Sequence, residues 1–113
     1  MQKLVSVVVP TFNCQDIIEE CLISVNKQTY KYIELIIVDS FSTDQTPIIS
    51  RKYGKVYSYG RDPSQKNIFA VPYQRNYGAS KAKGEYVYII DSDMRLTPKV
   101  VESCVDLIEE QGA

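Results

Sequence analysis

The sequence predicts an α/β fold in which a mostly parallel sheet of about four strands is flanked by helices. Short apolar runs rich in β-branched residues alternate along the chain with segments of helical periodicity, an order typical of β-α-β units. The apolar runs are nearly continuous, as expected for parallel strands that are buried on both faces. With 113 residues, of which 44% are hydrophobic and 24% charged, the chain suits one domain over residues 1–113.

The first strand is expected over residues 4–9, which are almost continuously apolar, and Pro10 ends it. Asn13 is expected to cap the helix that follows. In this helix, apolar side chains recur at helical spacing as far as Val25. Residues 33–38 form a second apolar run and predict a second buried strand.

Thr46 and Pro47 are expected as the N-cap and first-turn residues of a short second helix. Gly54 is expected to close this helix in a left-handed conformation, and residues 55–59 follow as a short third strand. Residues 60–72 lack periodicity and contain one glycine and two prolines. We expect them to form a loop that is long enough to have a function.

The third helix is expected over residues 73–83, and a glycine follows it directly. Residues 85–90 then predict the fourth strand. Thr97 and Pro98 are expected to open the last helix. Its apolar face is predicted to consist of Val101, Cys104, Val105 and Ile108.

The composition excludes several classes of function. The sequence contains no histidine, which removes histidine general bases, Ser-His-Asp triads and histidine zinc sites. The net charge of -1 provides no positive field for nucleic acid or for an anionic membrane surface. No apolar run approaches the ~18 residues of a membrane span and no secretory signal is evident, so a cytoplasmic location is expected. The three cysteines form no C-x-x-C pair and are expected to be reduced packing residues.

Polar side chains follow three of the four predicted strands. They lie at residues 10–13, at Asp39 and Ser40, and over residues 91–93. In wound parallel sheets, ligands bind beyond the carboxyl ends of the strands. We therefore expect these three segments to meet at one crevice.

Asp91 and Asp93 are candidate metal ligands. If strand geometry continues through them, their side chains project to the same side and both carboxylates can share one divalent cation. Mn²⁺ and Mg²⁺ prefer oxygen ligands, and a substrate diphosphate would complete such a site. The alternative is an acidic turn at the edge of the sheet, although the position directly after a buried strand favours the metal site.

Asp39 and Arg75 are the other candidate ligand-binding side chains. The carboxylate of Asp39 can accept a hydrogen bond from a nucleobase N–H or a ribose hydroxyl, or it can begin an Asx turn. Arg75 has a planar fork of donors that suits phosphate oxygens. Residues 51–83 hold eight basic side chains and one acidic one, whereas the rest of the chain holds five basic and thirteen acidic ones. A cationic segment that faces acidic strand ends suits a metal diphosphate.

Four segments together resemble the family 2 glycosyltransferases of the GT-A fold, which is Rossmann-like. They are residues 5–13 (VSVVVPTFN), 36–46 (IIVDSFSTDQT), 75–79 (RNYGA) and 83–93 (KGEYVYIIDSD). Their order and separation extend over nearly the whole chain. The resemblance implies a nucleoside-diphosphate-sugar donor, with a UDP-sugar as the commonest choice in the family.

The resemblance also assigns roles to individual residues. Thr11 and Asp39 would lie near the base and the ribose, and Asp91 and Asp93 would hold the ribose, the diphosphate and a Mn²⁺ or Mg²⁺ ion. Ser40 is a departure, since many relatives have a second acidic residue there. The implied donor site consists of Pro10, Thr11, Asn13, Asp39, Arg75 and Asp91.

Family members extend for at least another similar length, which supplies the acceptor site and an acidic general base. The resemblance therefore implies that residues 1–113 are the truncated donor-nucleotide-binding portion of a longer enzyme, with the base beyond Ala113 and no catalytic residue inside. It implies an inverting transfer to a hydroxyl of an acceptor saccharide or lipid-linked glycan. An exposed sheet flank would favour a homodimer, and the intact enzyme could be membrane-associated.

Two alternatives stay open. A noncatalytic nucleotide-binding or interaction module would keep the same fold and transfer nothing. A nucleotidyltransferase shares the sheet architecture, but the glycine-rich opening loop that it needs is absent between Pro10 and Cys14.

Overall fold

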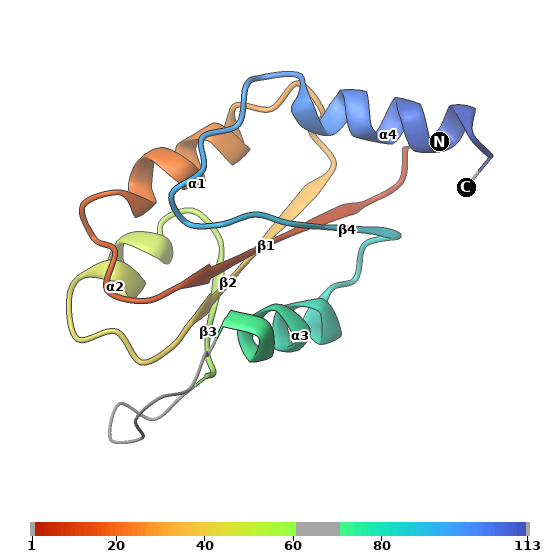
Figure 1. Cartoon of the computed structure of the whole chain (residues 1–113). Helices are drawn as coiled ribbons and strands as arrows, with labels where there is room; N and C mark the ends of the chain where they lie inside the picture. The colour runs from red at the N-terminus through yellow and green to blue at the C-terminus, as the bar shows by residue number, and fades with distance from the viewer. Residues whose placement is uncertain (1, 61–70, 113) are drawn as a thin grey trace.

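The computed structural model describes residues 2–60 and 71–112. Its strands form one parallel sheet in the order β3-β2-β1-β4, so that the first strand lies in the middle (Figure 1). The strands are β1 (Val5–Thr11), β2 (Ile33–Asp39), β3 (Lys55–Ser58) and β4 (Tyr86–Ile89). The predicted mostly parallel sheet of about four strands, flanked by helices, is confirmed.

The helices cover both faces of this sheet. They are α1 (Ile18–Asn26), α2 (Thr46–Ser50), α3 (Val71–Lys81) and α4 (Val100–Glu110). Figure 1 shows α3 on one face and the other three helices on the opposite face. Within residues 2–60 and 71–112, no helix has the length and apolar content needed to span a bilayer.

The strand β1 is buried on both faces because its side chains alternate between two cores. Val7 and Val9 belong to the larger core, together with side chains of α1 and α4. Val8 belongs to the smaller core under α3. Gly78 lets α3 approach this closely, since a Cβ atom there would lie 2.3 Å from Val8 Cγ1. Close packing thus accounts for a glycine that costs a helix about 1 kcal/mol relative to alanine.

Several predicted helix ends are wrong. Asn13 does not cap α1; its side chain instead accepts a hydrogen bond from the Thr43 N–H at 2.8 Å. Thr46 is the first residue of α2 rather than its N-cap, and its hydroxyl accepts from the Cys14 N–H at 2.9 Å. Gly54 is not left-handed, and it is required because a Cβ atom would lie 2.6 Å from a β2 carbonyl oxygen. Tertiary contacts therefore take the place of local caps.

Other boundaries also differ from the expectation. The strand β1 continues through Pro10 to Thr11, and α4 begins at Val100 rather than at Thr97 and Pro98. The helix α3 begins at Val71, so residues 71–72 are helical rather than part of the predicted loop. Residues 61–70 of that loop lie outside the described residues. In α4, Val101 and Val105 form the buried stripe, whereas Cys104 is exposed and does not pack in the core.

Candidate functional site at the carboxyl ends of the strands

Thr11 and Asp39 end β1 and β2 and lie opposite each other in the register of the sheet. The Thr11 hydroxyl donates a hydrogen bond to Asp39 Oδ1 at 2.7 Å. Both residues are 2% exposed. The sheet therefore brings together the two residues that the sequence placed near a base and a ribose.

Ser42 completes the surroundings of the Asp39 carboxylate. Its backbone N–H donates to Oδ2 at 2.8 Å, and its hydroxyl donates to Oδ1 at 2.6 Å. This N–H lies three residues after Asp39, whereas an Asx turn uses the N–H two residues on, so the bond is not that of an Asx turn. With the bond from Thr11, three of the roughly four acceptor directions of the carboxylate are used. Sequence reasoning missed Ser42 as a partner of Asp39.

The loop after β1 is held against the loop after β2 by side-chain hydrogen bonds. The Asn13 N–H donates to Ser42 Oγ at 2.8 Å, and the Gln15 N–H donates to Asp44 Oδ2 at 3.2 Å. Burial of the Asp44 carboxylate raises its pKa, but hydrogen bonds from Thr46 and Gln15 outweigh this and lower the pKa below its ordinary value. The two loops therefore form one ordered rim of the site.

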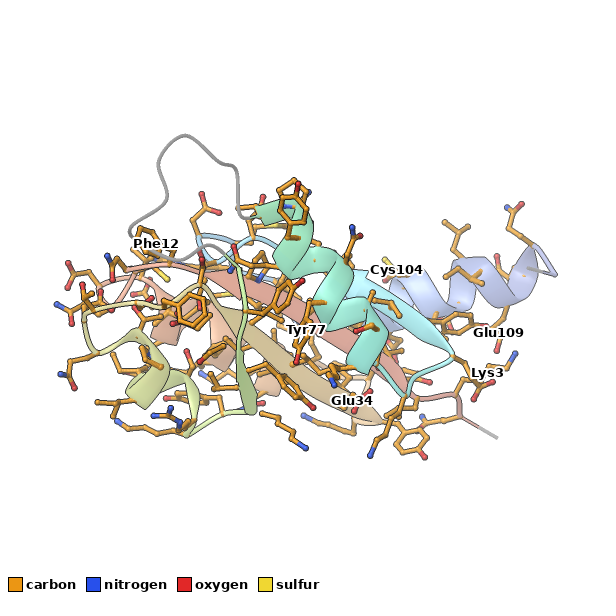
Figure 2. The ribbon with its side chains drawn as sticks, turned by 90° about the horizontal axis from the view of Figure 1, so that it is seen from below. Lys3, Phe12, Glu34, Tyr77, Cys104 and Glu109 are labelled. Atoms are coloured by element: carbon orange, nitrogen blue, oxygen red, sulfur yellow. The ribbon has the colours of Figure 1, made fainter. Side chains whose placement is uncertain are left out.

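Two phenylalanine side chains project from this rim. Phe12 is 55% exposed and Phe41 is 43% exposed. Phe41 adopts a left-handed backbone with φ of 54°, which is rare for a bulky residue. Figure 2 shows Phe12 at the end of the molecule opposite Lys3 and Glu109, which is the end where the strands finish. Sequence reasoning did not single out either ring.

Gln74 connects α3 to the same strand ends. Its side-chain amide is 1% exposed and donates to the carbonyl oxygens of Thr11 at 2.9 Å and Val38 at 2.7 Å. Gln74 and Gly78 are the buried residues of α3, and their spacing of four places them on one face of the helix. A glutamine four residues before a glycine in a predicted helix is the sequence signal that could have indicated a buried role for Gln74.

Arg75 reaches the end of β4. Its Nη2 donates to Asp91 Oδ1 at 2.8 Å, and the two side chains are 43% and 55% exposed. The neighbouring Nε of Arg75 is buried and has no hydrogen-bond partner within residues 2–60 and 71–112. The structure thus unites Arg75 with Asp91 and leaves one guanidinium donor unused.

Asp91 and Asp93 follow β4, but not in strand geometry. The strand ends at Ile89, and the Met94 N–H donates to the Asp91 carbonyl oxygen at 3.1 Å, which closes a turn. The premise that strand geometry continues through Asp93 is therefore wrong. Both side chains are exposed at this turn. No cluster of three or more carboxylate or thiol side chains suited to a metal ion occurs in the described part of the chain.

The cysteines near the site are poor nucleophiles. Burial, together with the charges of Cys14 and Asp93, raises the pKa of Cys21 to about 12. Burial also raises the pKa of Cys14. Both thiols are therefore protonated at neutral pH, and the Cys21 thiol lies 3.7 Å from the Asp91 carbonyl oxygen. The chemistry of the site consequently rests on carboxylates, amides, hydroxyls and Arg75.

Comparison with known proteins assigns the chain to a family. The family model described as glycosyl transferase family 2 matches residues 6–113. The chain is 36% identical over 113 residues to the glycosyltransferase GlyG of Streptococcus pneumoniae and covers 100% of itself but 38% of GlyG. It therefore spans less than half the length of that relative.

Two solved structures of similar fold contain ligands. The structure of Staphylococcus aureus TarS 1-349 with UDP-GlcNAc superposes with a TM-score of 0.79 at 30% identity, covering 95% of this chain and 31% of that one. The mannosyltransferase PcManGT of Pyrobaculum calidifontis, with GDP-Man and Mn²⁺, gives a TM-score of 0.65 at 30% identity over 82% of this chain and 28% of that one. The chain belongs to glycosyl transferase family 2 and has the GT-A fold.

Proposed function

We propose that this chain binds the nucleoside-diphosphate-sugar donor of a glycosyltransferase, with a UDP-sugar as the first candidate. The observation that carries the proposal is the position of α3. Its consecutive residues Gln74 and Arg75 join the carboxyl ends of β1, β2 and β4 through three hydrogen bonds. Ligands of wound parallel sheets bind at such a place. The TarS structure with UDP-GlcNAc has a similar fold and supports the choice of donor.

We assign the base and ribose to the rim formed by the loops after β1 and β2. Asp39 keeps about one free acceptor direction, which suits a single ring N–H or ribose hydroxyl. Thr11 fixes the orientation of that carboxylate, and Asn13 fixes the loop around it through Ser42 and Thr43. Pro10 lies inside β1, directly before Thr11. The four residues together would select a nucleoside rather than a bare phosphate.

We assign the diphosphate to Arg75 and to a divalent cation that Asp91 and Asp93 would hold. The donor set at the turn is two carboxylates, Asp91 and Asp93, which suits Mg²⁺ or Mn²⁺ when substrate phosphates and water supply the other ligands. The ion, when bound, would neutralise charge on the leaving diphosphate. The presence of Mn²⁺ in the PcManGT structure supports this choice of cofactor.

The intact enzyme would then transfer the sugar with inversion to a hydroxyl of an acceptor saccharide or lipid-linked glycan. Such a transfer is helped by a general base, which typically contributes 10²- to 10⁴-fold. The Asp39 carboxylate is buried and accepts three hydrogen bonds. With Asp91 and Asp93 both assigned to the cation, we propose that the base is supplied by residues outside 1–113. The protein would act on cytoplasmic nucleotide sugars.

Calorimetry of UDP binding to the chain, with and without Mn²⁺, tests the proposal. We expect Mn²⁺ to strengthen UDP binding and Asp93→Ala to abolish that increase. Asp106→Ala removes an exposed carboxylate on α4 and is the matched control, for which we expect no change. UDP affinity that is indifferent to Mn²⁺ in the unsubstituted chain would refute the metal assignment. A parent enzyme that binds UDP but releases no sugar would instead identify a noncatalytic binding module.

A further inference from the structure

We propose that Arg75 is exchanged between two partners: it neutralises Asp91 before the donor binds, and it moves to the diphosphate when a divalent cation takes its place at Asp91. This inference rests on the proposed donor site. Before the donor binds, Arg75 competes with the cation for Asp91. After the donor binds, Arg75 contacts the diphosphate.

On one edge of the Arg75 guanidinium group, only one of two neighbouring nitrogens, Nη2, donates a hydrogen bond within the described residues. A guanidinium group can offer two parallel N–H donors to a carboxylate or phosphate in a bidentate arrangement. Here Nη2 donates to Asp91 Oδ1 at 2.8 Å, whereas the adjacent Nε is buried and unpaired among the described residues. A buried donor without a partner is costly, so this arrangement is not the best that the group can reach. An anion with two neighbouring oxygens would satisfy both donors.

The contact between Arg75 and Asp91 is also weak enough to be exchanged. The side chains are 43% and 55% exposed, and solvent-exposed ion pairs contribute little to stability. A divalent cation carries twice the charge of a guanidinium group and prefers carboxylate oxygens. Two cations at one carboxylate repel each other, so binding of the metal at Asp91 favours departure of Arg75.

The backbone of α3 keeps the released guanidinium close to the site. Gln74, the preceding residue, is buried and bonded to the carbonyl oxygens of Thr11 and Val38. Only the side chain of Arg75 therefore needs to move. A diphosphate held by the same cation would present paired oxygens beside it, which match the Nε and Nη2 donors.

Titration of the chain with Mn²⁺, followed by the electron paramagnetic resonance signal of free Mn²⁺, tests the exchange. Without UDP, Arg75→Met removes the competitor, and we expect Mn²⁺ affinity to rise by up to about fivefold. With UDP present, the same substitution removes a charge-assisted contact to phosphate, and we expect affinity for UDP with Mn²⁺ to fall about tenfold or more. The two effects have opposite signs. A merely structural role of Arg75 would lower both affinities.

Two control variants separate charge from geometry. Arg95→Met removes an exposed arginine paired with Glu20, close in sequence to Asp93, and we expect it to change neither affinity. Arg75→Lys keeps the charge but loses the fork, so Mn²⁺ affinity should stay near that of the unsubstituted chain while UDP affinity falls. Unchanged or weaker Mn²⁺ binding by Arg75→Met, in a chain that binds UDP, would overturn the exchange alone. Failure of the unsubstituted chain to bind UDP would overturn the proposed function as well.

Discussion

The side-chain amide of Gln74 donates a hydrogen bond to the carbonyl oxygen of Thr11 at 2.9 Å, across 63 positions of sequence. A second bond from the same nitrogen to Val38 joins α3 to the end of β2. The Thr11 carbonyl oxygen also accepts a hydrogen bond from the Ser40 N–H at 3.0 Å, so Gln74 uses its second acceptor direction. Because Gln74 is held at the strand ends, its neighbour Arg75 lies within reach of Asp91.

Replacement of Gln74 by leucine should destabilise the protein by about 1–3 kcal/mol, because the hydrogen bonds from its buried amide to the carbonyl oxygens of Thr11 and Val38 would be lost. Urea denaturation followed by circular dichroism measures the change. Gln111→Leu, at an exposed position after α4, is the matched control and should shift the midpoint little. Equal midpoints for the two variants would show that the Gln74 hydrogen bonds contribute no net stability.

The stability of variants at position 41 should not follow the hydrophobicity of the new side chain, because the backbone of Phe41 is left-handed with φ of 54°. Asparagine tolerates this conformation, whereas a β-branched residue is strongly disfavoured in it. We expect Phe41→Val to be less stable than Phe41→Asn by about 1 kcal/mol, although valine is the more hydrophobic residue. Thermal unfolding of both variants measures the difference. The reverse order would mean that the left-handed backbone is not maintained.

Asp44 should give the stability of the protein a specific dependence on pH. Hydrogen bonds lower its pKa in the folded state, so its contribution is present above the unfolded value of about 4 and is lost as the pH falls through the lower folded value. Asp44→Asn should therefore be less stable than the unsubstituted chain at pH 7, and this difference in stability should narrow as the pH falls below the unfolded pKa and through the lower folded pKa. Denaturant unfolding at several pH values provides the measurement. Asp106→Asn, on the exposed side of α4, should show no such difference.

Local sequence predicted the helices and strands correctly, but it predicted their ends poorly. The apolar runs around Val8 and Ile37 placed the strands correctly, because burial on both faces leaves a pattern that is visible residue by residue. The caps at Asn13 and Thr46 failed, since both side chains are bonded to the neighbouring loop. Glycine at position 54 was explained by close packing rather than by a turn.

The sequence by itself determined the order of strands and helices, the parallel sheet and the family, because periodicity and motif order are properties of the chain alone. It also indicated which loops carry polar residues. Only the tertiary structure decided that Gln74 and Ser42 hold the site together, that Asp93 lies in a turn, and that Arg75 is paired with Asp91. Such contacts join residues whose distance depends on how the sheet and α3 pack, and no local pattern encodes that distance.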